Sequence, residues 1–210
     1  MRRYLLIGVA AALLAVPSVT FGGNLATVTV EAGGLDQFGP KTLTKRFGTG
    51  SILWRWDADG TTSIAHNVRQ DDKLFYSGPP TASNPSGFTV SPSAGTYHYY
   101  CEVHGSPNGG MDGTIRVQPL IQNKTATRFQ VEWANGLGET GNAYDVRYRV
   151  DLGPWQIWKN DIVARGALFG YHDQPVNIAP GHTYDIQVRS EKKADPSKVS
   201  DWSPVGRASY

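Results

Sequence analysis

The sequence contains one cysteine, Cys101, in a short stretch with two other side chains that can bind a metal ion. His104 follows it by three residues, and Met111, the one methionine besides Met1, follows it by ten. A second imidazole is available from His66, about 35 residues earlier. A thiolate, two imidazoles and a weak thioether form the ligand set of a blue-copper electron-transfer site. The sequence therefore predicts one copper ion per chain, with four candidate ligands: His66, Cys101, His104 and Met111.

Each ligand type has a chemical reason in such a site, and each has a plainer explanation when taken alone. Soft sulfur ligands favour Cu(I), and imidazole suits copper in both oxidation states. A lone cysteine, however, is usually a small buried hydrophobe, and a lone histidine often serves in a core or a turn. Together the residues favour the metal site, because a free thiol in an exported protein is a liability without a use. Zn(II) could occupy the same ligands without redox activity.

The elements that must position these ligands are strands. Short runs rich in β-branched and aromatic residues alternate with clusters of Gly, Pro, Asp and Asn, and no segment has a convincing helical period. The strand signals lie at residues 26–31, 51–56, 96–101, 113–117, 127–133, 144–150, 155–158 and 184–189. We predict an all-β chain in which three ligands occupy a loop between paired strands and the fourth joins only on folding.

The N-terminus has the order of a secretory signal. Arg2 and Arg3 precede an apolar run over residues 4–16, and Pro17 and small residues follow it. This run is shorter than the ~20 residues that a helix needs to cross a bilayer. We therefore predict that residues 1–22 are a removed signal peptide, by ordinary secretion or the twin-arginine route, that no membrane span follows, and that the protein is exported to the periplasm, the cell surface or the medium.

Formal charge argues against a nucleic-acid partner. The chain has 20 Lys and Arg residues against 18 Asp and Glu residues, and Arg2 and Arg3 belong to the leader, which leaves 18 against 18. Nucleic-acid-binding proteins carry a clustered basic face. We expect no nucleic-acid partner.

Several motifs in residues 24–118 point to a known family. They are Gly95-Thr96-Tyr97 leading into Tyr99-Tyr100-Cys101, the Cys-x-x-His spacing, Met111-Asp112-Gly113-Thr114-Ile115, and His66-Asn67-Val68. In these motifs the segment resembles a plastocyanin-type cupredoxin. The resemblance implies a Greek-key β-sandwich with the four candidate residues as copper ligands. It also implies electron transfer through the exposed edge of His104, with Tyr100 on a second route. His98 falls on the opposite face of its strand by parity, so we expect a surface residue and not a ligand.

The aromatic positions of residues 119–210 resemble those of a fibronectin type III domain. They are Trp133, Tyr144, Tyr148, the segment from Ile178 to Tyr184, and Ser200-Asp-Trp202-Ser-Pro204. The resemblance implies a second β-sandwich with these aromatics in its core and with Tyr184 as a tyrosine corner. Such modules are spacers or recognition units, so we expect a rigid spacer or docking surface, or a site for a partner protein or wall polysaccharide.

These features together predict an exported protein that carries single electrons between redox partner proteins. We expect no enzymatic activity, because the His-x-His pairs and additional histidines of multicopper oxidases and copper nitrite reductases are absent from the sequence. Two alternatives stay open. The protein could store or deliver copper without redox cycling, or it could be a cell-surface adhesion protein whose first half is only structural.

Overall fold

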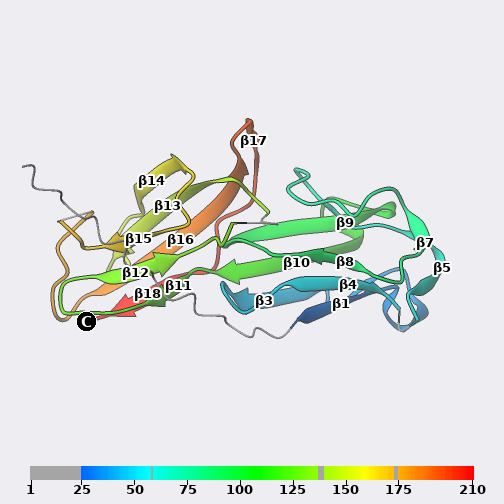
Figure 1. The fold of residues 1–210 in the computed structure, drawn as a ribbon, viewed down its shortest axis with the longest axis horizontal. Coiled ribbons are helices and arrows are strands. Elements are labelled where there is room, and N and C mark those ends of the chain that lie inside the picture. Colours follow the sequence, from blue (N-terminus) through cyan, green and yellow to red (C-terminus); the bar gives the residue numbers. More distant parts are fainter. Residues whose placement is uncertain (1–24, 58, 137–139, 173–174) are drawn as a thin grey trace, which may run out of the picture.

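The structure is a computed structural model of the 210-residue chain, and it describes residues 25–57, 59–136, 140–172 and 175–210. The predicted signal peptide, residues 1–22, lies outside the described residues. Within the described ranges, no helix is long and apolar enough to cross a membrane. Figure 1 shows an elongated molecule with one group of strands toward each end.

The described chain is almost entirely strands and turns, so the all-β prediction is confirmed. The first group consists of β1 (Ala26–Val30), β2 (Phe38–Gly39), β3 (Thr42–Arg46), β4 (Ile52–Trp56), β5 (Thr61–His66), β6 (Arg69–Gln70), β7 (Thr81–Ser83), β8 (Phe88–Val90), β9 (Gly95–Ser106) and β10 (Gly109–Gln118). The second consists of β11 (Leu120–Gln122), β12 (Phe129–Glu132), β13 (Ala143–Val150), β14 (Gln156–Ile162), β15 (Gly166–Phe169), β16 (Thr183–Lys192), β17 (Asp195–Val199) and β18 (Gly206–Ser209). One short 3₁₀ helix, η1 (Ala32–Gly34), follows β1 in the described ranges.

The first group, which we call the first sandwich, contains two main sheets. Their strand orders are β2-β1-β4-β8 and β3-β10-β9-β6, and β5 pairs with β7 separately. The pairs β1/β4 and β3/β10 are parallel, whereas β9 and β10 are antiparallel. One buried cluster takes Val28 and Trp54 from the first sheet and Tyr97, Tyr99 and Ile115 from the second. The sheets therefore pack face to face, and alternate residues of each strand supply the core.

The second group, the second sandwich, has sheets of order β11-β12-β15 and β14-β13-β16-β17, with β18 beside β16. The Tyr184 hydroxyl accepts a hydrogen bond from the Ala179 amide at 2.9 Å and donates to the Asn177 carbonyl at 3.4 Å. This is the predicted tyrosine corner. Strand order and corner make the unit a fibronectin type III-like β-sandwich.

The aromatics predicted for the core of the second sandwich divide into two groups. Trp133, Tyr144 and Tyr148 are buried as predicted. The prediction is wrong for Trp202, which is half-buried on the surface, where its ring stacks with the guanidinium groups of Arg147 and Arg189 at 4.2 and 5.0 Å from the ring centroid. An indole ring stacked with cations gains electrostatic attraction without burial in the core.

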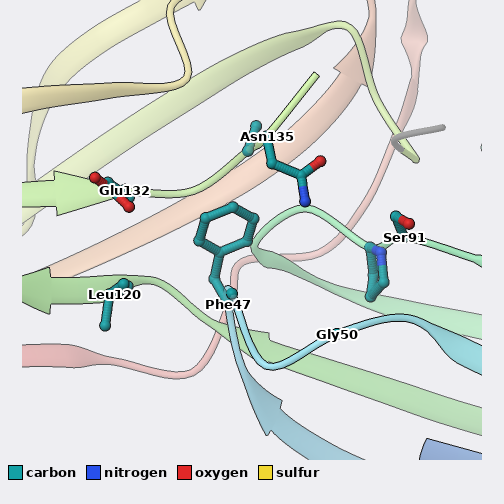
Figure 2. A pocket seen from close by; sticks show the side chains of 9 residues that line it. Phe47, Gly50, Ser91, Leu120, Glu132 and Asn135 are labelled. Atoms are coloured by element: carbon teal, nitrogen blue, oxygen red, sulfur yellow. The ribbon is translucent and has the colours of Figure 1, made fainter. Parts of the chain in front are cut away.

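The two sandwiches meet at the start of β9. Thr96 exchanges backbone hydrogen bonds with Asp201, and the Ala94 amide donates to the Trp133 carbonyl at 2.8 Å. A pocket of about 330 Å³ lies at this junction. Phe47 of the first sandwich and Asn135 of the second both line it (Figure 2). From the junction β9 runs toward the far end of the first sandwich, as Figure 1 shows.

Candidate metal centre

Cys101 and His104 lie in the hairpin of β9 and β10, whose register explains how they come together. Gly105 pairs with Gly110 and Tyr100 pairs with Asp112, so residues 101–104 of β9 lie opposite one residue of β10. In a regular strand, residues three apart point to opposite faces. A bulge breaks this alternation and re-aims side chains. The sequence indicated a ligand loop here, whereas the structure shows a bulged hairpin with strand pairing on both sides.

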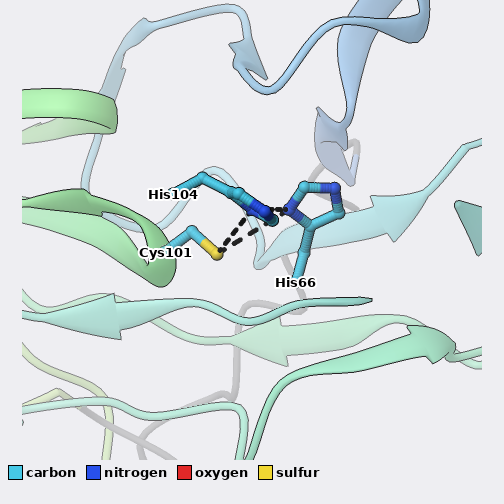
Figure 3. A group of neighbouring side chains, drawn as sticks. All are labelled: His66, Cys101 and His104. Carbon is cyan, nitrogen blue, oxygen red and sulfur yellow. Dashed lines mark hydrogen bonds between the residues drawn. The ribbon is translucent and has the colours of Figure 1, made fainter. Parts of the chain in front are cut away.

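The third side chain, His66, comes from a separate strand earlier in the sequence. His66 is the last residue of β5, which Figure 1 places at the end of the molecule farthest from the second sandwich. Its Nδ1 lies 3.7 Å from the Cys101 Sγ and 3.1 Å from the His104 Nδ1, and the Sγ lies 3.7 Å from the same His104 nitrogen. Figure 3 shows the three side chains pointing toward one another. We call them the ligand trio.

The spacing of the ligand trio can be tested against the needs of a metal ion. An ion about 2.3 Å from a sulfur and about 2.0–2.1 Å from each nitrogen, with bond angles near 100–120°, requires S–N separations of roughly 3.3–3.8 Å and an N–N separation of roughly 3.1–3.6 Å. The measured separations of 3.7, 3.7 and 3.1 Å fall within these ranges. The three ligand atoms therefore fit one metal ion without rearrangement.

The surroundings of the ligand trio favour binding. Cys101 and His66 are fully buried, whereas His104 is half-buried and reaches the surface. Burial lowers the pKa of His66, and the neighbouring His104 lowers it further. The His66 ring is therefore neutral at physiological pH and can offer a nitrogen lone pair, which metal ligation requires.

Met111, the fourth predicted ligand, faces the bulge from β10. It is the residue opposite positions 101–104, it is 1% exposed, and it belongs to the same buried cluster as Cys101. The approach of the two strands is close here, because a Cβ atom on Gly105 would lie 2.5 Å from the Met111 carbonyl oxygen. Only glycine fits at position 105 without moving the backbone. Met111 thus lies in the same hairpin as Cys101 and His104, on the strand opposite them.

A partly buried polar network ties the segment after His66 to the cysteine strand. The Asn67 side-chain amide donates to Glu102 at 2.7 Å, and its carbonyl accepts from the Glu102 amide at 2.8 Å. Arg69 donates to the same carboxylate at 2.7 Å. Burial raises the pKa of Glu102, but the hydrogen bonds from Arg69 and Asn67 outweigh it and leave the pKa lowered. The network holds His66 and Cys101 at a set separation, and the spacing of residues in the sequence did not indicate the role of Glu102.

The sequence also singled out two other residues of β9, Tyr100 and His98. Tyr100 is 8% exposed, and the Arg69 guanidinium covers its ring at 5.5 Å from the centroid. His98 lies outside the ligand trio, and its Nε2 contacts Asp201 of the second sandwich at 3.2 Å. The histidine predicted to be a simple surface residue thus bridges the two sandwiches.

Comparisons with known proteins add little to this picture. No family model matches the chain, and no curated protein matches it. Among solved structures, it is similar to the FN1–FN3 domains of chicken CNTN1, with a TM-score of 0.32, 12% identity, and coverage of 75% of this chain and 58% of that one. It is also similar to a cytokine receptor complex, with a TM-score of 0.32, 18% identity, and coverage of 74% and 88%. Likenesses this slight assign neither fold nor function.

Proposed function

We propose that the protein is an exported type 1 copper protein that carries single electrons between redox partner proteins. The observation that carries this proposal is the convergence of the Cys101 Sγ and the Nδ1 atoms of His66 and His104 at distances that suit one metal ion. Two nitrogens and a thiolate sulfur, with a thioether as a weak fourth ligand, favour copper over hard cations. The plastocyanin-type motifs of residues 24–118 support the same assignment.

The protein's own contribution is to fix the positions of the ligands and to exclude water from them. Bound copper would supply the one-electron couple between Cu(I) and Cu(II). Cys101 and His66 are 0% exposed, so water has little access to their ligand atoms. The paired strands β9 and β10 on one side, and the bonds of Asn67 to Glu102 on the other, fix three ligands before any metal arrives. Ligands fixed in this way would move little when copper changes its oxidation state, and fast electron exchange needs that small rearrangement.

The path of the electron between the copper and a redox partner follows from which ligand is exposed at the surface. His104 is the one member of the ligand trio that reaches the surface, so a redox partner would approach there. Tyr100 is covered by Arg69 and offers a less direct route. The second sandwich joins the opposite end of β9, and we propose that it serves as a spacer or docking module that leaves the His104 end free.

Copper titration of the exported chain tests the proposal. We expect Cu(II) to bind at one equivalent with an intense blue colour from charge transfer between the cysteine sulfur and copper. Cys101→Ser should abolish the colour, and His104→Gln should alter or abolish it. His98→Gln is the matched control, because this histidine lies outside the ligand trio, and it should leave the spectrum unchanged.

Three results would contradict the proposal in different ways. A colourless copper complex without a reversible redox couple would favour copper storage or delivery. Binding of Zn(II) in place of copper from an equimolar mixture would point to a site without redox function. Stability and partner binding that ignore metal would favour the adhesion hypothesis.

A further inference from the structure

A buried carboxylate lies behind the histidine ligand of β5. The Glu31 side chain is 7% exposed, and both of its oxygens accept hydrogen bonds from Ser63, one from the backbone amide at 2.7 Å and one from the hydroxyl. Ser63 precedes His66 by three residues on the same strand. Glu31 itself has left-handed backbone angles, φ 60° and ψ 47°. A glutamate persists in that conformation only where its surroundings hold it there.

The carboxylate faces the nitrogen of His66 that does not face the trio. Nε2 lies 3.5 Å from the Glu31 Oε2, while Nδ1 points to the Cys101 sulfur. The Nε2 atom is buried and has no hydrogen-bond partner within the described part of the chain. The other nearby acid, Asp36, is 3.9 Å away and 48% exposed. Glu31 is thus the buried negative charge to which a proton on Nε2 would be drawn.

We infer that Glu31 is a positioning residue for the metal centre, which keeps the His66 proton on Nε2, turns the Nδ1 lone pair toward the trio, and favours the more highly charged state of a bound metal. The last part rests on the proposed function. Partners of this kind behind a ligating histidine fix its tautomer and raise its basicity. The attraction strengthens when metal binding polarises the ring, because the N–H then faces the carboxylate with more positive charge.

Three variants separate this role from a structural one. Glu31→Gln removes the charge but keeps an oxygen that can accept from Ser63. Ser63→Ala removes one of the two groups that hold the carboxylate and changes an exposed side chain, so it keeps the inference testable if the first variant folds poorly. Asp36→Asn is the matched control, because it neutralises a carboxylate that is farther away and half-exposed.

The first measurement uses the metal-free protein and nitrogen-15 correlation spectra of the histidine rings. We expect His66 to carry its proton on Nε2 in the unmodified protein, to become a mixture of tautomers in Glu31→Gln, and to be unchanged in Asp36→Asn. A His66 tautomer that is the same with and without Glu31 would overturn the inference. This readout needs no copper, so it stands apart from the proposed function.

The second measurement compares metal affinities and the copper reduction potential. Loss of such a partner costs about 10–100-fold in metal affinity, and we expect Glu31→Gln to lose about tenfold more for Cu(II) than for Cu(I). That ratio corresponds to a rise in potential of about 59 mV for a one-electron couple. Ser63→Ala should shift in the same direction by less. Affinities within twofold of the unmodified protein would overturn the inference, whereas a tautomer change in a chain that takes up no copper would overturn the proposed function alone.

Discussion

Two tyrosines on one face of β9 allow a sharp test of how the sandwiches are joined. Tyr97 is fully buried at the junction, and its hydroxyl lies 2.9 Å from the Ser93 carbonyl and 2.8 Å from the Ser190 hydroxyl, while Thr140 donates to it at 2.7 Å. Tyr99, two residues on, is 1% exposed, and its hydroxyl has no hydrogen-bond partner within the described residues. Removal of the hydroxyl oxygen should therefore lower stability at Tyr97 but not at Tyr99.

Replacement of Tyr97 by phenylalanine removes three hydrogen bonds that join buried polar groups of the two sandwiches. A buried polar group costs about 1–3 kcal/mol when unpaired. Two remaining bonds limit the loss, one from Ser190 to the Ala94 carbonyl at 3.1 Å and one from the Ser93 amide to the Thr140 hydroxyl at 3.2 Å. We expect the free energy of unfolding to fall by about 2 kcal/mol. Tyr99→Phe removes a hydroxyl that is buried without compensation, so it should be neutral or raise stability by about 1 kcal/mol.

Scanning calorimetry of both variants provides the comparison. For a folded region of 150–250 residues, 1 kcal/mol corresponds to about 2–4 °C in Tm, so Tyr97→Phe should melt about 4–8 °C lower. Tyr210→Phe is the control for loss of a hydroxyl at an exposed site, where one bond reaches the Arg128 carbonyl at 3.0 Å. Equal losses in the Tyr97 and Tyr99 variants would refute the reasoning, as would a Tyr97 variant within about 0.5 kcal/mol of the unmodified protein.

Two further predictions follow from buried groups elsewhere. The Asp185 carboxylate is 1% exposed and accepts hydrogen bonds from Arg149 at 2.9 Å and from Arg207 at 2.6 and 2.9 Å. Burial raises the pKa of Asp185, but the two guanidinium groups outweigh burial and lower that pKa overall. A lowered pKa in the folded state adds stability at pH values above the unfolded-state pKa of about 3.9. This stability is lost as the pH falls through the folded-state pKa. Asp185→Asn should therefore lower the free energy of unfolding by about 2–3 kcal/mol at pH 7, which is less than for a fully buried pair because Arg207 is half-exposed. In urea titrations, the stability difference between the variant and the unmodified protein should be smaller at pH 3 than at pH 7. The same difference at both pH values would contradict this prediction. Met111→Leu conserves side-chain volume at a site that is 1% exposed, so the free energy of unfolding should change by less than about 1.5 kcal/mol. Voltammetry of the copper-loaded variant should show a raised reduction potential, because a donor to Cu(II) is lost. An unchanged potential would exclude Met111 as a ligand.

The parts of the structure that could be predicted from the sequence depend on local patterns. Alternation of apolar and polar residues indicated strands at residues 26–31 and 144–150, which the structure shows as β1 and β13. The rarity of cysteine, with a histidine three residues later, was enough to bring Cys101 and His104 to attention. The tyrosine corner at Tyr184 depends on contacts only five to seven residues away.

The parts that could not be predicted depend on which strands become neighbours. Glu31 is one of 18 acidic residues, and nothing in its local sequence marks it. Its place behind His66 follows from the hydrogen bonds that join it, just after β1, to Ser63 of β5. The bond of Tyr97 to Ser190 spans 93 residues. The core prediction for Trp202 is wrong because a large aromatic residue is typical of a core, whereas here the ring stacks with Arg147 and Arg189 and is half-buried.

The anchoring of β9 at both ends gives the second sandwich a physical reason to be present. At its start, Thr96 is paired with Asp201 of the second sandwich, and Tyr97 joins the buried network of the junction. Near its other end lie Cys101 and His104. A strand held at both ends by hydrogen bonds of buried and half-buried groups has little freedom to shift its bulge, because movement at either end would leave polar groups unpaired. If the trio binds copper as proposed, the second sandwich would limit rearrangement at the metal as well as act as a spacer. Weakening the junction with Tyr97→Phe should then slow electron self-exchange even though no ligand is touched.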